Sequence, residues 1–229
     1  MLCGPGESYI DANNRLMKRF EAALSDTDEH LINQAAAGDF AAFQELTGRF
    51  QSRVFRVAIR IVGQQQDAED VTQQTFLSLI EHVDSFRGES SVATWILRIA
   101  TNHALKVLRK RRGLPTVVWE ESADEDSYST LPHPEFIARW SATPETLVQQ
   151  AEVREQIESA LTTLDEKYRI VFVLRDIEGL SVRETAESLE LTEASVKVRL
   201  SRARLLMREQ LTRAFGDEST RIFPDHEHG

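Results

Sequence analysis

Basic and polar side chains recur near the C-terminal end of the sequence at spacings that suit contact with nucleic acid. A short helix-forming run at 182–189 is followed by the turn Glu190-Leu191-Thr192, and a longer helical pattern then begins. Two helices joined by a tight turn are typical of a helix-turn-helix, whose second helix enters the major groove of DNA. Arginine can bind guanine through two hydrogen bonds, and serine can reach several base atoms. The side chains expected at base edges and phosphates are Ser195, Lys197, Val198, Arg199, Ser201, Arg202 and Arg204.

An apolar stripe on the same helix supports this interpretation. It consists of Val196, Leu200, Ala203, Met207 and Leu211, which recur at helical spacing and should pack on the core of a domain. The simpler alternative is an arginine-rich surface helix with no role in binding. We favour the nucleic-acid role because the turn, the preceding helix and the stripe all agree.

A second basic segment, at 90–112, has polar and apolar side chains on opposite faces of an expected helix. Val92, Ile96 and Ala100 belong to the apolar face, where His103 is expected as a packed core residue, and Leu105 is an apolar exception on the polar face. Cations suit phosphates, amides suit base edges, and a tryptophan offers a stacking surface. A solvated helix face with a partly buried tryptophan explains this helix equally well. The polar face consists of Thr94, Trp95, Arg98, Asn102, Lys106 and Arg109.

The preceding helix, expected at 66–86, has the opposite character. Its expected inward stripe is Val71, Phe76, Leu79, Ile80 and Val83. Acids and amides on the outward side suggest a surface for a protein partner, although a merely soluble face is the commoner explanation of such a run. These outward residues are Asp67, Glu69, Asp70, Gln73 and Gln74.

The remaining pattern predicts an all-α chain, because helical spacing recurs throughout and strand-like alternation of useful length does not. We expect two small helical domains joined by a flexible acidic linker that contains Pro115, Pro132 and Pro134. The expected divisions are an N-terminal extension (1–27), a first domain (28–112), the linker (113–143), a second domain (144–215) and a polar tail (216–229).

The bulk composition limits the classes of protein. The chain has 229 residues and a formal net charge of −10, which opposes unaided binding to DNA and suggests a partner that supplies more positive surface. Solubility alone also explains an acidic total. The single cysteine, Cys3, suits the cytoplasm. The sequence contains neither a secretory signal nor the run of about 18 apolar residues that a membrane helix needs, so we expect no membrane insertion.

Four stretches together resemble bacterial RNA polymerase sigma factors of the extracytoplasmic-function (ECF) group. They are DAEDVTQQTF (67–76), FRGESSVATWILRIATNHALKVLRKRR (86–112), LDEKYRIVFVLRDIEGLSVRETAESL (164–189) and TEASVKVRLSRARLLMREQL (192–211). The order and spacing of the four are specific, and the resemblance covers about residues 28–215. It implies a non-enzymatic subunit without a cofactor, which is carried to promoter DNA by core RNA polymerase.

The resemblance also implies residue roles. The helix at 67–76 would dock on the clamp coiled coil of the largest polymerase subunit, and the second domain would read the −35 element. The linker would thread the polymerase channel, and an anti-sigma factor is expected as a further partner. Lys106 departs from the family, in which many members carry an acid at this position. The loop that would capture an extruded base of the −10 element consists of Phe86, Arg87, Gly88, Glu89, Ser90 and Ser91.

The sequence is compatible with two other functions. An independent helix-turn-helix regulator would bind its duplex without polymerase, with the first domain sensing a ligand or dimerising. An enzyme would have to rely on the tail Asp225-His226-Glu227-His228 or on pairs of acids, but the sequence holds no nucleophile elbow or phosphate loop. Two histidines two residues apart make a weak metal site, so we expect no bound metal.

Overall fold

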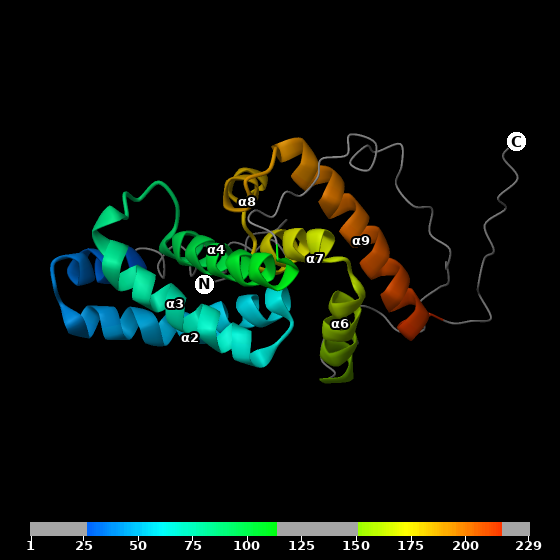
Figure 1. Ribbon diagram of the computed structural model, residues 1–229, viewed down its shortest axis with the longest axis horizontal. Helices are drawn as coiled ribbons and strands as arrows, with labels where there is room; N and C mark the ends of the chain where they lie inside the picture. The colour runs from blue at the N-terminus through cyan, green and yellow to red at the C-terminus, as the bar shows by residue number, and fades with distance from the viewer. Residues whose placement is uncertain (1–26, 114–150, 217–229) are drawn as a thin grey trace, which may run out of the picture.

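The structure is a computed structural model that describes residues 27–113 and 151–216, and these form two groups of helices (Figure 1). In the first group, α2, α3 and α4 lie alongside one another. Its elements are a helical segment at 27–36, α2 (Phe40–Val62), α3 (Gln65–His82), the 3-10 turn η1 (Val83–Ser85) and α4 (Val92–Arg112).

The second group contains the helix-turn-helix. Helix α7 continues directly into a π-helical stretch, and α9 packs against α6, α7 and α8. Its elements are α6 (Ala151–Thr163), α7 (Glu166–Phe172), the π-helical stretch η3 (Val173–Ile177), α8 (Val182–Leu189) and α9 (Glu193–Phe215). For residues 27–113 and 151–216, the expectation of an all-helical architecture with two helical bodies is therefore confirmed.

Local signals in the sequence determine where these helices begin and end. Ser91 caps α4, because its side chain accepts a hydrogen bond of 3.1 Å from the Thr94 backbone N–H. Gly113 ends α4 in the left-handed conformation (φ 65°), which glycine adopts without strain. Helix α8 starts with a reciprocal capping box between Ser181 and Glu184.

One cluster of buried apolar side chains runs from the first body into the second. Leu46, Ile61 and Ile96 belong to it in the first body, and Leu174 and Leu189 belong to it in the second. A smaller cluster joins α6 to α9 through Leu161, Ala203 and Met207, among others. The two bodies therefore pack on one another in this conformation.

The expected inward stripe of α3 is partly wrong. Ile80 is 54% exposed and Phe76 is only half-buried, whereas Thr72 and Thr75 are buried. Each threonine hydroxyl donates a 2.7 Å hydrogen bond to a carbonyl one turn earlier in its own helix. Because that bond satisfies the hydroxyl, threonine can occupy a core position that an apolar pattern assigns to its neighbours.

Several expectations lie outside the described residues. They concern the N-terminal extension before Thr27, the linker from Leu114 with its prolines and acids, the helix start at Pro144, and the histidine-containing tail after Gly216.

Candidate nucleic-acid and polymerase interfaces

The polar side chains of α4 occupy different environments. Asn102 and Lys106 are exposed, whereas Thr94, Arg98 and Arg109 are half-buried. At about 100° per residue, Thr94, Arg98 and Leu105 lie along one edge of the helix. Leu105, the apolar exception on this face, is 3% exposed and belongs to the cluster shared by the two bodies. Part of the expected DNA-binding face thus belongs to the apolar core that the two bodies share.

The loop between η1 and α4 is anchored by an aromatic pair. The ring centroids of Phe86 and Trp95 are 5.5 Å apart with an interplanar angle of 62°, the edge-to-face geometry that aromatic rings favour. Gly88 has φ 70° and allows the chain to turn at the loop tip. The tip residues Arg87, Gly88 and Glu89 are exposed, and the half-buried Ser90 and the cap Ser91 lead into α4.

Helix α8 covers this edge of α4 with two carboxylates. Nη1 of Arg98 lies 3.3 Å from Oε2 of Glu187, and the side chain of Thr94 hydrogen-bonds Glu184. Burial acts to raise the pKa of the Glu184 carboxyl, but hydrogen bonds from Ser181 and Thr94 outweigh it and lower the pKa below its usual value. Glu184 therefore stays ionised beside the basic helix.

The turn before α9 has the geometry that the sequence predicts. Glu190 adopts a left-handed conformation (φ 55°) at the end of α8, and the Thr192 side chain caps α9 by accepting from Ser195 N–H at 3.1 Å. The candidate base-reading residues of α9 differ in exposure. Lys197 and Arg204 are exposed and Ser201 is half-buried, whereas Ser195, Val198, Arg199 and Arg202 are buried.

Two arginines of α9 have partners that sequence reasoning missed. Nη1 of Arg202, which is 6% exposed, donates to the Tyr168 hydroxyl at 3.0 Å. Arg204 donates two hydrogen bonds of 2.7 Å to Asp176, and this pairing raises the pKa of its guanidinium. Tyr168 and Asp176 are 34 and 28 residues away in sequence, so local periodicity contains no signal for either contact.

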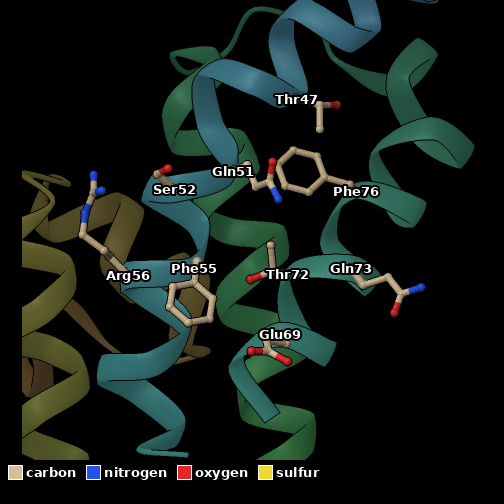
Figure 2. Close-up of a pocket in the computed structure, with 9 residues that line it drawn as sticks. All are labelled: Thr47, Gln51, Ser52, Phe55, Arg56, Glu69, Thr72, Gln73 and Phe76. Carbon is tan, nitrogen blue, oxygen red and sulfur yellow. The ribbon is translucent and has the colours of Figure 1, made fainter. Parts of the chain in front are cut away.

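The side chains expected to bind polymerase lie along one surface of α3, here called the α3 ridge, and a groove separates this ridge from α2. The ridge consists of Asp67, Glu69, Asp70, Gln73 and Gln74. Glu69 and Gln73 border this groove, which has a volume of about 770 Å³, and Figure 2 shows their side chains at its α3 wall. Phe55 and Phe76 supply apolar surface within it. The other lining residues are Thr47, Gln51, Ser52, Arg56 and Thr72.

On the other side of the ridge, α3 faces α4. Asp70 and Gln74 share a smaller hollow of about 210 Å³ with Lys106 and Lys110. Asp67, at the start of α3, pairs with Arg111 at the end of α4. The five expected residues are therefore brought onto one helix surface, and the acids adjoin the basic end of α4.

His103 lies at the edge of the core between α3 and α4, where it is half-buried. Its Nε2 is 2.9 Å from the hydroxyl oxygen of Ser78. Burial, with a smaller contribution from the charge of Lys106, lowers the pKa of the imidazole below its usual value. The expectation of a packed residue rather than a ligand agrees with these contacts.

Comparison with known proteins places both bodies in one family. Residues 46–113 match the family "Sigma-70 region 2", and residues 154–207 match "Sigma-70, region 4". The ECF RNA polymerase sigma factor SigW of Bacillus subtilis is 30% identical over 180 residues, which are 79% of this chain and 94% of SigW. The chain belongs to the ECF family of RNA polymerase sigma factors. The ECF sigma-E factor of Escherichia coli is likewise 30% identical, over 78% of this chain and 91% of that protein.

Solved structures agree with this assignment. CnrH, in complex with the cytosolic domain of CnrY, is 26% identical with a TM-score of 0.52, over 82% of this chain and 99% of CnrH. The sigma factor RpoE of Bartonella quintana, in complex with the anti-sigma factor NepR, shares the fold at 21% identity and a TM-score of 0.53, over 74% of this chain and 96% of that one.

Membership of the family settles the general activity. This sigma factor directs transcription initiation, and sigma factors bind core RNA polymerase and promoter DNA without being enzymes. Helix α8, the turn after it and α9 as far as Met207 lie within the region 4 match. Within the described residues, none of the helices has both the length and the apolar character required to cross a membrane.

Proposed function

We propose that the first domain holds the opened −10 element of a promoter between α4 and the loop before it. Extruding a base costs a few kcal/mol of unstacking, and stacking on an aromatic ring returns about 1–3 kcal/mol. The half-buried Trp95 ring and the exposed loop tip supply such a surface. The Phe86–Trp95 ring contact is the observation that carries this proposal, because it fixes the loop against the helix.

The cations of α4 would bind the strand next to that base. Arg98, Asn102, Lys106 and Arg109 follow the loop along the helix, and their charges and amide suit phosphates and base edges. Lys106 lines the hollow between α3 and α4 that Asp70 also lines. Its contact with DNA would therefore be at the margin of the binding face.

The second domain would read the −35 element with α9. Residues near the start of a recognition helix meet the bases, which assigns Ser195, Val198, Arg199 and Arg202 to base edges. The exposed cations Lys197 and Arg204 suit phosphates. Direct readout requires Arg199 and Arg202, which are 1% and 6% exposed here, to become accessible when DNA binds.

The α3 ridge would dock on the clamp coiled coil of the largest polymerase subunit. Asp67, Glu69, Asp70, Gln73 and Gln74 lie on it, and Leu77, 45% exposed, with Ile80, 54% exposed, extends it with apolar surface. Apolar side chains flanked by polar ones are common at protein interfaces.

An anti-sigma factor would hold this sigma factor inactive. Support comes from the similar sigma factors whose structures contain a partner protein. The α2–α3 groove, with Phe55 and Phe76 in its wall, has a volume of about 770 Å³, which can receive side chains of such a partner.

Run-off transcription tests the proposal directly. Core RNA polymerase with the purified chain should yield promoter-dependent transcripts from a genomic fragment library. Trp95→Ala should reduce permanganate reactivity of the −10 region while assembly with core is retained. Phe40→Ala, which removes a 74% exposed aromatic ring elsewhere in the first domain, serves as the matched control. Normal strand opening by the Trp95 variant would remove this ring from the proposed role.

A further inference from the structure

The two walls of the α2–α3 groove each follow one face of a helix. Their residues recur at intervals of three and four, which places them one above another on a helix surface. The α2 wall contains Thr47, Gln51 and Phe55, and the α3 wall contains Glu69, Gln73 and Phe76. A helix laid in this groove would therefore meet one line of side chains from α2 and one from α3.

The same intervals extend both walls beyond the groove. Phe40 lies seven residues before Thr47 on α2, and Ile80 lies four residues after Phe76 on α3. Phe40 is 74% exposed and Ile80 is 54% exposed, and with Leu77 they are the large apolar side chains that are exposed in the described parts of the chain. Exposed apolar surface with a polar rim marks sites of protein interaction.

Within the groove, one polar group has no partner. The Thr47 hydroxyl oxygen is buried, and no described residue forms a hydrogen bond with it. Buried polar atoms are almost always hydrogen-bonded, so an unpaired one favours an occupant that completes it. The exposed amides of Gln51 and Gln73 line the same groove (Figure 2). An occupant should therefore combine apolar side chains with at least one hydrogen-bonding group.

The sequence that precedes the described residues has this combination. Its apolar residues recur at intervals of seven, three and four, as they do on a helix that packs between two others. They are Ile10, Met17, Phe20 and Leu24. Asn13 occupies the remaining position in this line, and its side-chain amide can both donate and accept hydrogen bonds.

The charges beside this apolar line match those of the groove. Glu69 lines the α3 wall and suits the cations of the segment, whereas Arg56 lines the α2 wall and suits its acid Glu21. Complementary charges favour one pairing of two surfaces over others. The cations of the segment are Arg15, Lys18 and Arg19.

The segment is close enough and long enough to lie in the groove. Asp28, near the start of the described part, pairs with Arg49 of α2 at 2.8 Å, so the chain emerges beside the middle of α2. Leu24 lies four residues before Asp28, a reach of about 13 Å, and a helix with its side chains is about 10–12 Å across. As a helix, residues 10–24 would be about 22 Å long, close to the length of α2 between Phe40 and Phe55.

We propose that residues 10–24 bind in the α2–α3 groove of the free sigma factor and compete there with core polymerase. A helix in this groove would cover Glu69 and Gln73, which belong to the α3 ridge. The inference rests on the proposed function, because this cover is inhibitory only if the ridge docks on polymerase. Residues 10–24 precede both family matches, at 46–113 and 154–207, so the matched regions assign this segment no role.

A short tether makes such a contact effective and still reversible. Segments linked over a few residues meet at an effective concentration in the mM range, so a contact that is weak between separate molecules is well populated within one chain. If the segment occupies the groove in about nine of ten free chains, the apparent affinity for core falls about tenfold. Core polymerase, with a larger interface, would displace the segment.

Photo-crosslinking within the full chain tests the occupant of the groove. The photoreactive residue p-benzoylphenylalanine at position 20 should form crosslinks within one chain to peptides that contain 47–56 or 69–76, and core polymerase should reduce their yield. The same probe at position 22, on the opposite side of the apolar line, is the matched control and should crosslink weakly. Crosslinks from position 20 to other parts of the chain, crosslinks between two chains, or equal yields from both positions would overturn the proposal.

The affinity of full-length variants for core polymerase tests the competition. Phe20→Asp should release the segment and raise the affinity up to about tenfold, whereas Ala22→Asp should leave it unchanged. An affinity of Phe20→Asp equal to that of wild type would refute competition. The proposed function is scored separately: normal assembly of Asp70→Arg with core would refute docking by the ridge, while the crosslinks still report the occupant of the groove.

Discussion

Arg98 of α4 and Glu187 of α8 form an ion pair between the two bodies, with 3.3 Å between Nη1 and Oε2. The same Arg98 is a candidate ligand of the −10 strand, so Glu187 and promoter DNA would compete for one guanidinium. Both side chains are 43% exposed, and an exposed pair of this kind is worth about 0.2–1 kcal/mol.

Removing the charge of Glu187 should therefore strengthen binding of a −10 oligonucleotide to the free chain modestly. Glu187→Gln is expected to lower the dissociation constant up to about fivefold at low salt, and less at high salt because screening weakens the wild-type pair. Fluorescence anisotropy measures this, with Glu155→Gln on α6 as the control. Equal affinities of wild type and Glu187→Gln would show that this pair does not compete.

Reversing the charge of Asp70 should impair assembly with core polymerase. Asp70 is exposed on the α3 ridge, so Asp70→Arg places a cation in the proposed clamp contact without disturbing the fold. We expect the affinity for core to fall tenfold or more. Like charges placed together at an interface cost several kcal/mol, and about 1.4 kcal/mol corresponds to a tenfold loss of affinity. The control is Glu29→Arg, which reverses the charge of an exposed residue on the helical segment at 27–36. Normal holoenzyme formation by Asp70→Arg would contradict the docking assignment.

Arg202→Ala should weaken −35 recognition and also lower stability. The buried guanidinium donates to Tyr168, and removing one partner of a buried hydrogen bond costs about 1–3 kcal/mol. Lys197→Ala, at an exposed neighbouring position, should weaken promoter binding with an unchanged melting temperature and reduce the salt slope by about one. Thermal melting and binding of holoenzyme to a −35 duplex separate the two effects. Unaltered promoter strength in Arg202→Ala would exclude this residue from readout.

His103 should make the first domain less stable in mild acid. Because its folded pKa is lowered, the unfolded chain binds the proton more readily, and stability falls as pH drops below about 6.5, the ordinary value of histidine. The contribution is fully present above that pH and is lost as pH falls towards the folded pKa. His103→Gln should therefore lose less stability than wild type between pH 7.5 and 5.5 in denaturant titrations. Parallel pH profiles would contradict this assignment.

Much of the fold was predictable because its signals are local. The caps Ser91 and Thr192, the glycine after α4 and the stripe through Val196 and Leu200 act within a few residues of the helices that they define. The sigma-factor resemblance rested on such local motifs, and the family matches confirm it.

Contacts between the bodies were not predictable, because they join residues far apart in sequence. Leu105 looked like an anomaly on a polar face, yet it is buried and belongs to the apolar cluster that runs through both bodies. Arg202 has the spacing of a base-reading residue. Its hydrogen bond to Tyr168 joins residues 34 positions apart, so the helical periodicity of the sequence cannot indicate it. The prediction for Ile80 was wrong in the opposite sense, because this apolar side chain is exposed. Thr72 and Thr75 occupy core positions of α3 instead, and each hydroxyl donates to a carbonyl of the same helix.

The dependence of promoter binding on core polymerase tests the central claim most directly. The affinity of the purified chain for a promoter duplex should be measured alone and after assembly with core, at one salt concentration. The net charge of −10 and the covered edge of α4 predict weak, unselective binding by the free chain and tight, promoter-selective binding by the holoenzyme. Equally tight and selective binding without polymerase would contradict the account.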